Sequence, residues 1–134
     1  MLNVSHLNPD ALPRNPAFSQ AVSVAGPART IYVGGQNAVL ADGAVAGDDA
    51  AAQTARALEN VEVVLAEAGA RLEDVVYWSI SLVDGQPLPA AFAAFRQVWG
   101  ARPNPPAISV AFVAGLANPR FLVEVSAIAV VEAA

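Results

Sequence analysis

One carboxylate in this sequence stands out as a candidate acid or base. Glu124 lies in the segment FLVEVS, 121–126, where most of its neighbours are apolar. Burying a charge without a partner is costly, so we expect either a donor to meet this carboxylate or its charge to be suppressed. Two interpretations stay open: an ion pair with an arginine, such as Arg102 or Arg120, or a general acid or base that orients a water molecule.

A glycine pair is the second candidate feature. Gly34 and Gly35 lie in VGGQ, 33–36, inside a run that is otherwise typical of a strand. Glycine within a strand indicates a bulge or the close approach of another part of the chain. It also exposes backbone N–H groups that can bind the carboxylate or carbonyl group of a ligand. The residues alone leave both interpretations open.

His6 is the only histidine in the chain. It lies in an N-terminal segment, residues 1–15, that we expect to be irregular, and we expect the imidazole to be exposed. A metal site needs several ligands, and a Ser-His-Asp triad would have to use this one histidine. The sequence therefore predicts no metal centre and no such triad.

Hydrophobic periodicity and turn residues predict the elements that carry these groups. A helix is expected between a capping Asp48 or Asp49 and Gly69, because its apolar residues recur every three or four positions. A hairpin is expected around the turn at Gly26, and a second helix opens with prolines. The predicted strands are 17–25, 30–36, 74–84, 107–114 and 121–131, and the second helix is 88–99.

The order of these elements, β-β-α-β-α-β-β, predicts one α/β (α+β) domain over residues 1–134. We expect a two-layer sandwich, a mixed sheet with both helices on one face. The last strand is apolar on both sides, whereas a half-exposed sheet would alternate more cleanly. The face without helices is therefore predicted to pack against neighbouring subunits.

Composition excludes several classes of partner. The net charge is −5, and all seven basic residues are arginines scattered along the chain, so no cationic patch for nucleic acid is expected. There is no cysteine, which excludes disulfides and thiolate zinc sites. The longest apolar run, about 107–117, is roughly half the length of a membrane span. The N-terminus lacks the pattern of a signal peptide, so a cytoplasmic protein is expected.

Four short motifs and one helix occur in a fixed order along the chain: AFSQAV (17–22), VGGQ (33–36), the capped alanine-rich helix, PPAISVAFVAGL (105–116) and VEVSAIAVV (123–131). In this order and spacing they resemble the Rid family, also called reactive intermediate deaminases, YjgF-type proteins and the L-PSP endoribonuclease group. The resemblance implies a chorismate-mutase-like fold and a homotrimer with ligand clefts between subunits. Archetypal members hydrolyse imines and enamines of amino acids, such as 2-aminoacrylate, without a metal or cofactor.

Carried over position by position, the resemblance implies a changed site. Phe18 stands where the archetype has a tyrosine, and Gly34-Gly35-Gln36 replaces Ser-Gly-Gln. Ile108, followed by Ser109, stands where an arginine grips the substrate carboxylate. Val110 replaces a cysteine, and an asparagine of the second helix falls near Pro89. Glu124 matches the glutamate that positions the attacking water.

Isoleucine cannot replace a planar cation with five donors. A buried carboxylate that lost this partner would cost on the order of a thousandfold in rate or affinity. We therefore do not expect the archetypal deaminase activity, unless Arg102 or Arg120 substitutes for the missing arginine. Two functions stay open: a homotrimer that binds a small molecule, or a cofactor-independent hydrolase or deaminase of a non-carboxylate imine, enamine or carbonyl, with Glu124 orienting water. Low basicity argues against a ribonuclease.

Overall fold

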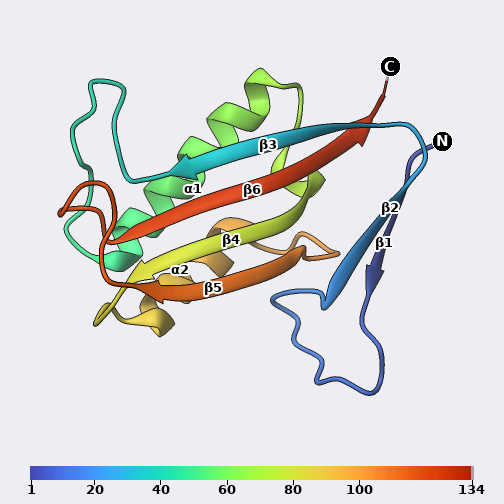
Figure 1. Ribbon diagram of the computed structural model, residues 1–134, viewed down its shortest axis with the longest axis horizontal. Coiled ribbons are helices and arrows are strands. Elements are labelled where there is room, and N and C mark those ends of the chain that lie inside the picture. The colour runs from blue at the N-terminus through green and yellow to red at the C-terminus, as the bar shows by residue number, and fades with distance from the viewer. Residues whose placement is uncertain (134) are drawn as a thin grey trace.

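A mixed four-stranded sheet and two helices form the two layers of the molecule (Figure 1). The computed structural model describes residues 1–133. The strands of the sheet lie in the order β3-β6-β4-β5; β4 and β5 are parallel, and the other neighbours are antiparallel. Their bounds are β3 (Ala28–Gln36), β4 (Val75–Val83), β5 (Ala107–Val113) and β6 (Val123–Glu132). Both helices lie behind one face of this sheet, which confirms the predicted α+β sandwich.

The helices begin and end where the sequence predicts. α1 (Ala50–Glu67) starts after Asp49, whose side chain accepts a hydrogen bond from the backbone N–H of Ala52 at 2.8 Å. It ends before Gly69, which has a φ of +75° that favours glycine. α2 (Leu88–Trp99) has a proline in its first turn and is followed by Gly100. A short 3-10 turn, η1 (Leu72–Asp74), connects α1 to β4.

The core lies between the helices and the sheet. Leu58, Val61 and Leu65 of α1 are fully buried against it, as are the alternate β6 residues. Trp78 of β4 meets Phe95 of α2 edge to face, with ring centroids 5.2 Å apart and planes at 84°. This packing fixes which face of each strand is turned towards the helices.

The N-terminal part of the chain differs from the prediction. Residues 3–7, expected to be irregular, form β1 (Asn3–Leu7), which pairs antiparallel with β2 (Ala21–Ala25). The predicted hairpin is therefore wrong, because β2 pairs with β1 while β3 pairs with β6. Gly26, with a φ of +93°, lies where the chain passes from one sheet to the other. β2 also starts later than predicted, which leaves Phe18 in the loop before it.

The face of the sheet without helices is only partly covered. On β6 the alternate residues Glu124, Ser126 and Ile128 are half-buried on this open face. Tyr32 of β3, paired with Ile128, is 77% exposed.

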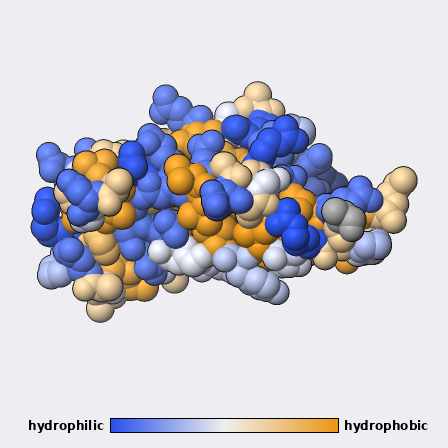
Figure 2. Space-filling model, turned by 90° about the horizontal axis from the view of Figure 1, so that it is seen from above, coloured by the Kyte–Doolittle hydropathy of each residue, from blue (hydrophilic) through white to orange (hydrophobic). Residues whose placement is uncertain are grey.

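Viewed from above, at right angles to Figure 1, the surface of the molecule mixes hydrophobic and hydrophilic areas (Figure 2). Among residues 1–133, no helix is both long and apolar enough to cross a membrane.

Candidate functional site

The glycine pair forms a bulge that receives the side chain of Glu124. Val33 pairs with Ala127 and Gln36 pairs with Val125, so both glycines lie opposite the single residue between those partners. A Cβ built on Gly35 would lie 2.6 Å from both Cδ and Oε1 of Glu124, closer than real Cβ atoms approach. A Cβ on Gly34 would meet nothing within 4 Å. Gly35 therefore leaves the space that the Glu124 carboxylate occupies.

The Glu124 carboxylate is not committed to another side chain. In the part of the chain that the structure describes, it takes part in no ion pair and no side-chain hydrogen bond. Arg102 is held elsewhere: its Nε donates to Glu73 at 2.9 Å, and its Nη1 donates to the carbonyl oxygens of Val98 and Trp99. The interpretation that pairs Glu124 with Arg102 is therefore wrong. Half-buried and unpaired, this carboxylate keeps its oxygens available to water or a ligand.

A buried glutamine holds the segment that leads into β6. Gln53 of α1, 2% exposed, donates to the carbonyl oxygens of Gly47 and Arg120 and accepts from the N–H of Leu122. Asn37 adds a bond from its amide to the carbonyl oxygen of Val123. These contacts position the backbone just before Glu124. This role was not predicted from the sequence, although an amide on the apolar face of a helix is a signal that could have indicated it.

Ile108 and Val110 face the helices. They pair in register with Trp78 and Ile80 of β4, which belong to the core. Ile108 packs against that core, and Val110 lines a small apolar crevice between the sheet and α2 with Phe92. Ile108, at which the resemblance implies a replaced arginine, is therefore an apolar side chain on the helix-facing side of an edge strand.

Ser109 faces the opposite way from these neighbours. It pairs with Ser79, and its hydroxyl accepts a hydrogen bond from the hydroxyl of Tyr77. Successive residues on a strand point to opposite faces, so Ser109 lies on the open face. Ser109 therefore does not share a face of β5 with Ile108 and Val110.

Phe18 lies near the beginning of β5. The next residue, Ser19, is buried; its N–H donates to the carbonyl oxygen of Pro106 at 3.0 Å, and its hydroxyl donates to that of Pro105 at 2.6 Å. These two bonds attach the loop that carries Phe18 to the segment just before Ile108.

The predicted site residues thus fall into two groups. Gly34, Gly35 and Glu124 lie together on β3 and the adjoining strand β6, whereas Phe18, Ile108, Ser109 and Val110 lie on β5 or next to it. β3 and β5 are the two edges of the sheet, with β6 and β4 between them. A single chain does not bring the two groups together.

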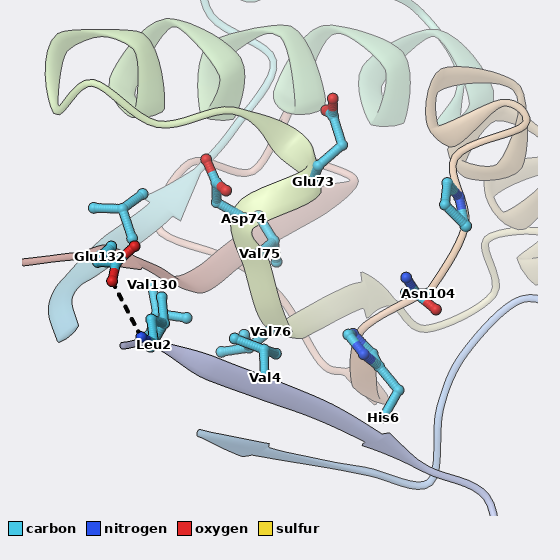
Figure 3. Close-up of a pocket in the computed structure, with 12 residues that line it drawn as sticks. Leu2, Val4, His6, Glu73, Asp74, Val75, Val76, Asn104, Val130 and Glu132 are labelled. Carbon is cyan, nitrogen blue, oxygen red and sulfur yellow. Dashed lines mark hydrogen bonds between the residues drawn. The ribbon is translucent and has the colours of Figure 1, made fainter. Parts of the chain in front are cut away.

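A cavity of about 350 Å³ lies away from both groups, between β1, the start of β4 and the end of β6. His6 and Asn104 face each other across it, and Glu132 accepts a hydrogen bond from the N–H of Leu2 (Figure 3). The prediction of an exposed His6 is wrong, because it is half-buried in β1, and this burial lowers the pKa of its imidazole. Within residues 1–133, no group of three or more histidine or acidic side chains is arranged to hold a metal.

Comparison with known proteins finds one family model that matches most of this chain. The family model described as Endoribonuclease L-PSP matches residues 9–131. A Rid-family protein of unknown function, YyfB from Yersinia pestis, is 35% identical over 96% of this chain and 99% of its own, with a TM-score of 0.84.

Two further solved structures are similar. Rv2704 from Mycobacterium tuberculosis, a member of the YjgF/YER057c/UK114 family, is 30% identical over 96% of this chain and 100% of its own, with a TM-score of 0.66. The YjgF gene product from E. coli is 29% identical over 84% of this chain and 86% of its own, with a TM-score of 0.70. No curated protein matches the chain.

Proposed function

This chain belongs to the Endoribonuclease L-PSP family, which includes the Rid and YjgF proteins, and from this premise we propose that it binds a small, uncharged molecule in clefts between identical subunits. The assembly is a homotrimer, and the archetypal reaction on 2-imino acids is lost. The observation that carries this proposal is the separation of the candidate residues into one group on β3 and β6 and another around β5, towards the two opposite edges of one sheet.

The separation supports a site completed by a second copy. Gly35 and Glu124 belong to the β3 side, and Ile108 and Val110 to the β5 side. In a cyclic head-to-tail assembly, one edge of each subunit meets the other edge of the next, and the ring closes without a free edge. Neither edge strand has a second partner within residues 1–133, so both present unpaired backbone groups that an assembly would cover.

The side chains support an uncharged ligand. Ile108 and Val110 offer an apolar wall where a carboxylate would need a cation, and Arg102 is committed to Glu73 and two carbonyl groups. A ligand carboxylate buried without a partner would cost on the order of a thousandfold in affinity. The cleft therefore favours a molecule whose end near β5 is neutral.

A second candidate function is hydrolysis of a neutral imine or enamine, and the unpaired carboxylate of Glu124 favours it. A general base must have an oxygen free to accept a proton. Glu124 would take one proton from water while the water oxygen attacks the C=N carbon of the imine, to which an enamine tautomerises, and would return that proton to the nitrogen. It would then move the hydroxyl proton of the resulting carbinolamine to the nitrogen as the C–N bond breaks, which yields a carbonyl compound and ammonia.

The proposal is tested by a coupled assay on freshly generated 2-aminoacrylate, with wild type, Ile108→Arg and the neutral control Ile108→Met. We expect wild type and Ile108→Met to stay at the background rate and Ile108→Arg to release pyruvate and ammonia. Circular dichroism checks that each variant is folded. Turnover by wild type well above background would overturn the proposal that this protein has lost the archetypal reaction.

A further inference from the structure

We propose that Ser81 is a specificity-determining residue of the Glu124 site, and that the site takes a neutral ligand bearing a hydroxyl or carbonyl group that bonds to the Ser81 hydroxyl. The inference rests on the proposed function, because it names the ligand class of the same cleft. Ser81 itself lies on β4, outside the short motifs that carry the family resemblance.

Ser81 lies directly beside Glu124 on the open face. The two residues are paired across the antiparallel strands β4 and β6. Two positions further along, the N–H of Val83 donates to the carbonyl oxygen of Leu122. Because hydrogen-bonded pairs recur at every second position, Ser81 and Glu124 form such a pair, with Cα atoms about 5.5 Å apart. Both side chains therefore project from neighbouring positions on the open face of the sheet.

Glu124 is flanked by a glycine on one side and a small residue on the other. On the β3 side its carboxylate lies against Gly35, which has no side chain. On the β4 side its neighbour Ser81 is small and half-buried. Because the Glu124 carboxylate lies against Gly35 and the Ser81 hydroxyl has no partner among residues 1–133, this hydroxyl is left to bond to an oxygen atom of a ligand at about 2.8 Å.

Ser81 continues into a patch of hydroxyl groups. In the next row of the sheet Ser79 pairs with Ser109 on one side and Ser126 on the other. The Ser109 hydroxyl is engaged by Tyr77, whereas the hydroxyls of Ser79, Ser81 and Ser126 make no hydrogen bond with any other described residue. Hydroxyls both donate and accept, so this patch suits a neutral polar group.

The charge of the patch also selects against an anion. Pairing in register places Tyr32, Ile128, Ser126 and Ala111 on the same face near Glu124, and none of them is charged. Within residues 1–133, Glu124 is the one charged residue that the four strands place in this part of the open face, because Glu132 of β6 lies eight positions away, beside Leu2. A carboxylate ligand would meet a like charge without a compensating cation, whereas a neutral ligand would not.

Hydroxyacetone and pyruvate make a matched pair of probes. Both are three-carbon ketones with a methyl group, and they differ only in a hydroxymethyl group against a carboxylate. Titration of the ¹⁵N-labelled full chain, followed by NMR, gives a dissociation constant for each probe and identifies the amides that respond. We expect hydroxyacetone to bind at least about tenfold more tightly than pyruvate, with shifts at Gly35 and Ser81.

Three variants assign the effect to the hydroxyl group. Ser81→Ala should weaken the binding of hydroxyacetone by about tenfold, Ser81→Thr should keep most of it, and Ser23→Ala, on exposed β2, should leave it unchanged. The inference is overturned if Ser81→Ala binds hydroxyacetone as wild type does, if pyruvate binds equally well, or if hydroxyacetone does not bind. The Ile108→Arg assay tests the proposed function separately. A failure of the Ser81 inference can therefore be told apart from a failure of the proposed function.

Discussion

The carboxylate of Glu124 lies against the backbone of Gly35, at a place where a Cβ would be 2.6 Å from its Cδ atom. The contact joins the third strand of the chain to the last, and it depends on the bulge that sets Gly34 and Gly35 opposite one residue of β6. It is a direct contact between two candidate site residues that lie far apart in the sequence. An acid that is uncommitted yet held in place suits either ligand binding or water activation.

Gly35→Ala should displace Glu124 while changing stability little. The clash involves the far end of a flexible side chain, so the carboxylate can move at a cost of about 1 kcal/mol or less. We expect the carboxyl ¹³C resonance of Glu124 to shift and hydroxyacetone binding to weaken. Gly34→Ala is the matched control, because its Cβ meets nothing within 4 Å. Equal behaviour of the two variants would show that the contact with Gly35 does not position Glu124.

Gln53→Met should destabilise the fold. The substitution keeps the length of the side chain but leaves the carbonyl oxygens of Gly47 and Arg120 and the N–H of Leu122 without their partner. Buried polar groups left unsatisfied cost about 1–3 kcal/mol each, so we expect a loss of at least about 2 kcal/mol in the free energy of unfolding by urea. Gln97→Met, on the exposed side of α2, is the control for the same chemical change. A loss no larger than that control's would contradict this role of Gln53.

Arg102→Gln should also lower stability, through the connector between α2 and β5. Its guanidinium bonds to Glu73 and to the carbonyl oxygens of Val98 and Trp99, which end the helix. We expect the variant to lose about 1–2 kcal/mol in urea unfolding. Arg71→Gln removes an exposed ion pair of 3.8 Å with the same Glu73 and should cost less than about 0.5 kcal/mol. Equal losses would mean that the backbone contacts of Arg102 contribute nothing.

His6 should make stability depend on pH near neutrality. Burial lowers the pKa of its imidazole below the ordinary 6.5, so the folded state favours the neutral form. The unfolded chain binds a proton at higher pH than the folded one, and stability therefore falls as pH decreases through 6.5 and on through the lower folded pKa. In His6→Gln, the urea midpoint should change less between pH 7.5 and 5 than it does in wild type. These two pH values lie on either side of the ordinary pKa of histidine. An unchanged slope would contradict the lowered pKa.

The sequence predicted the helices and the order of the main strands well, because capping residues and periodicity are local signals. Asp49, Gly69 and Gly100 mark helix ends that the structure confirms. The hairpin prediction was wrong because strand pairing depends on distant partners: β3 pairs with residues almost 100 positions later. β1 was missed because five residues with mixed polarity do not distinguish a short strand from an irregular segment.

Candidate site residues could be named from the sequence, but their arrangement in space could not. A strand alternates faces, so Ile108 and Ser109 could have been assigned to opposite sides from sequence alone. That Glu124 meets Gly35, by contrast, depends on a bulge and on the register between β3 and β6. That β3 and β5 are opposite edges depends on the strand order, which no local pattern specifies. Because of this bulge and this strand order, the predicted residues lie in two separate groups.

The most direct test of a site shared between copies is chemical cross-linking at the two edges. The chain has no cysteine, so Gly34→Cys on β3 and Val110→Cys on β5 introduce the only thiols, and a short bis-maleimide joins those that lie close. In the double variant we predict covalent species of two and three chains and none larger, with each single variant staying uncrosslinked. A double variant that stays monomeric on the denaturing gel would contradict the central claim that β3 of one copy meets β5 of the next.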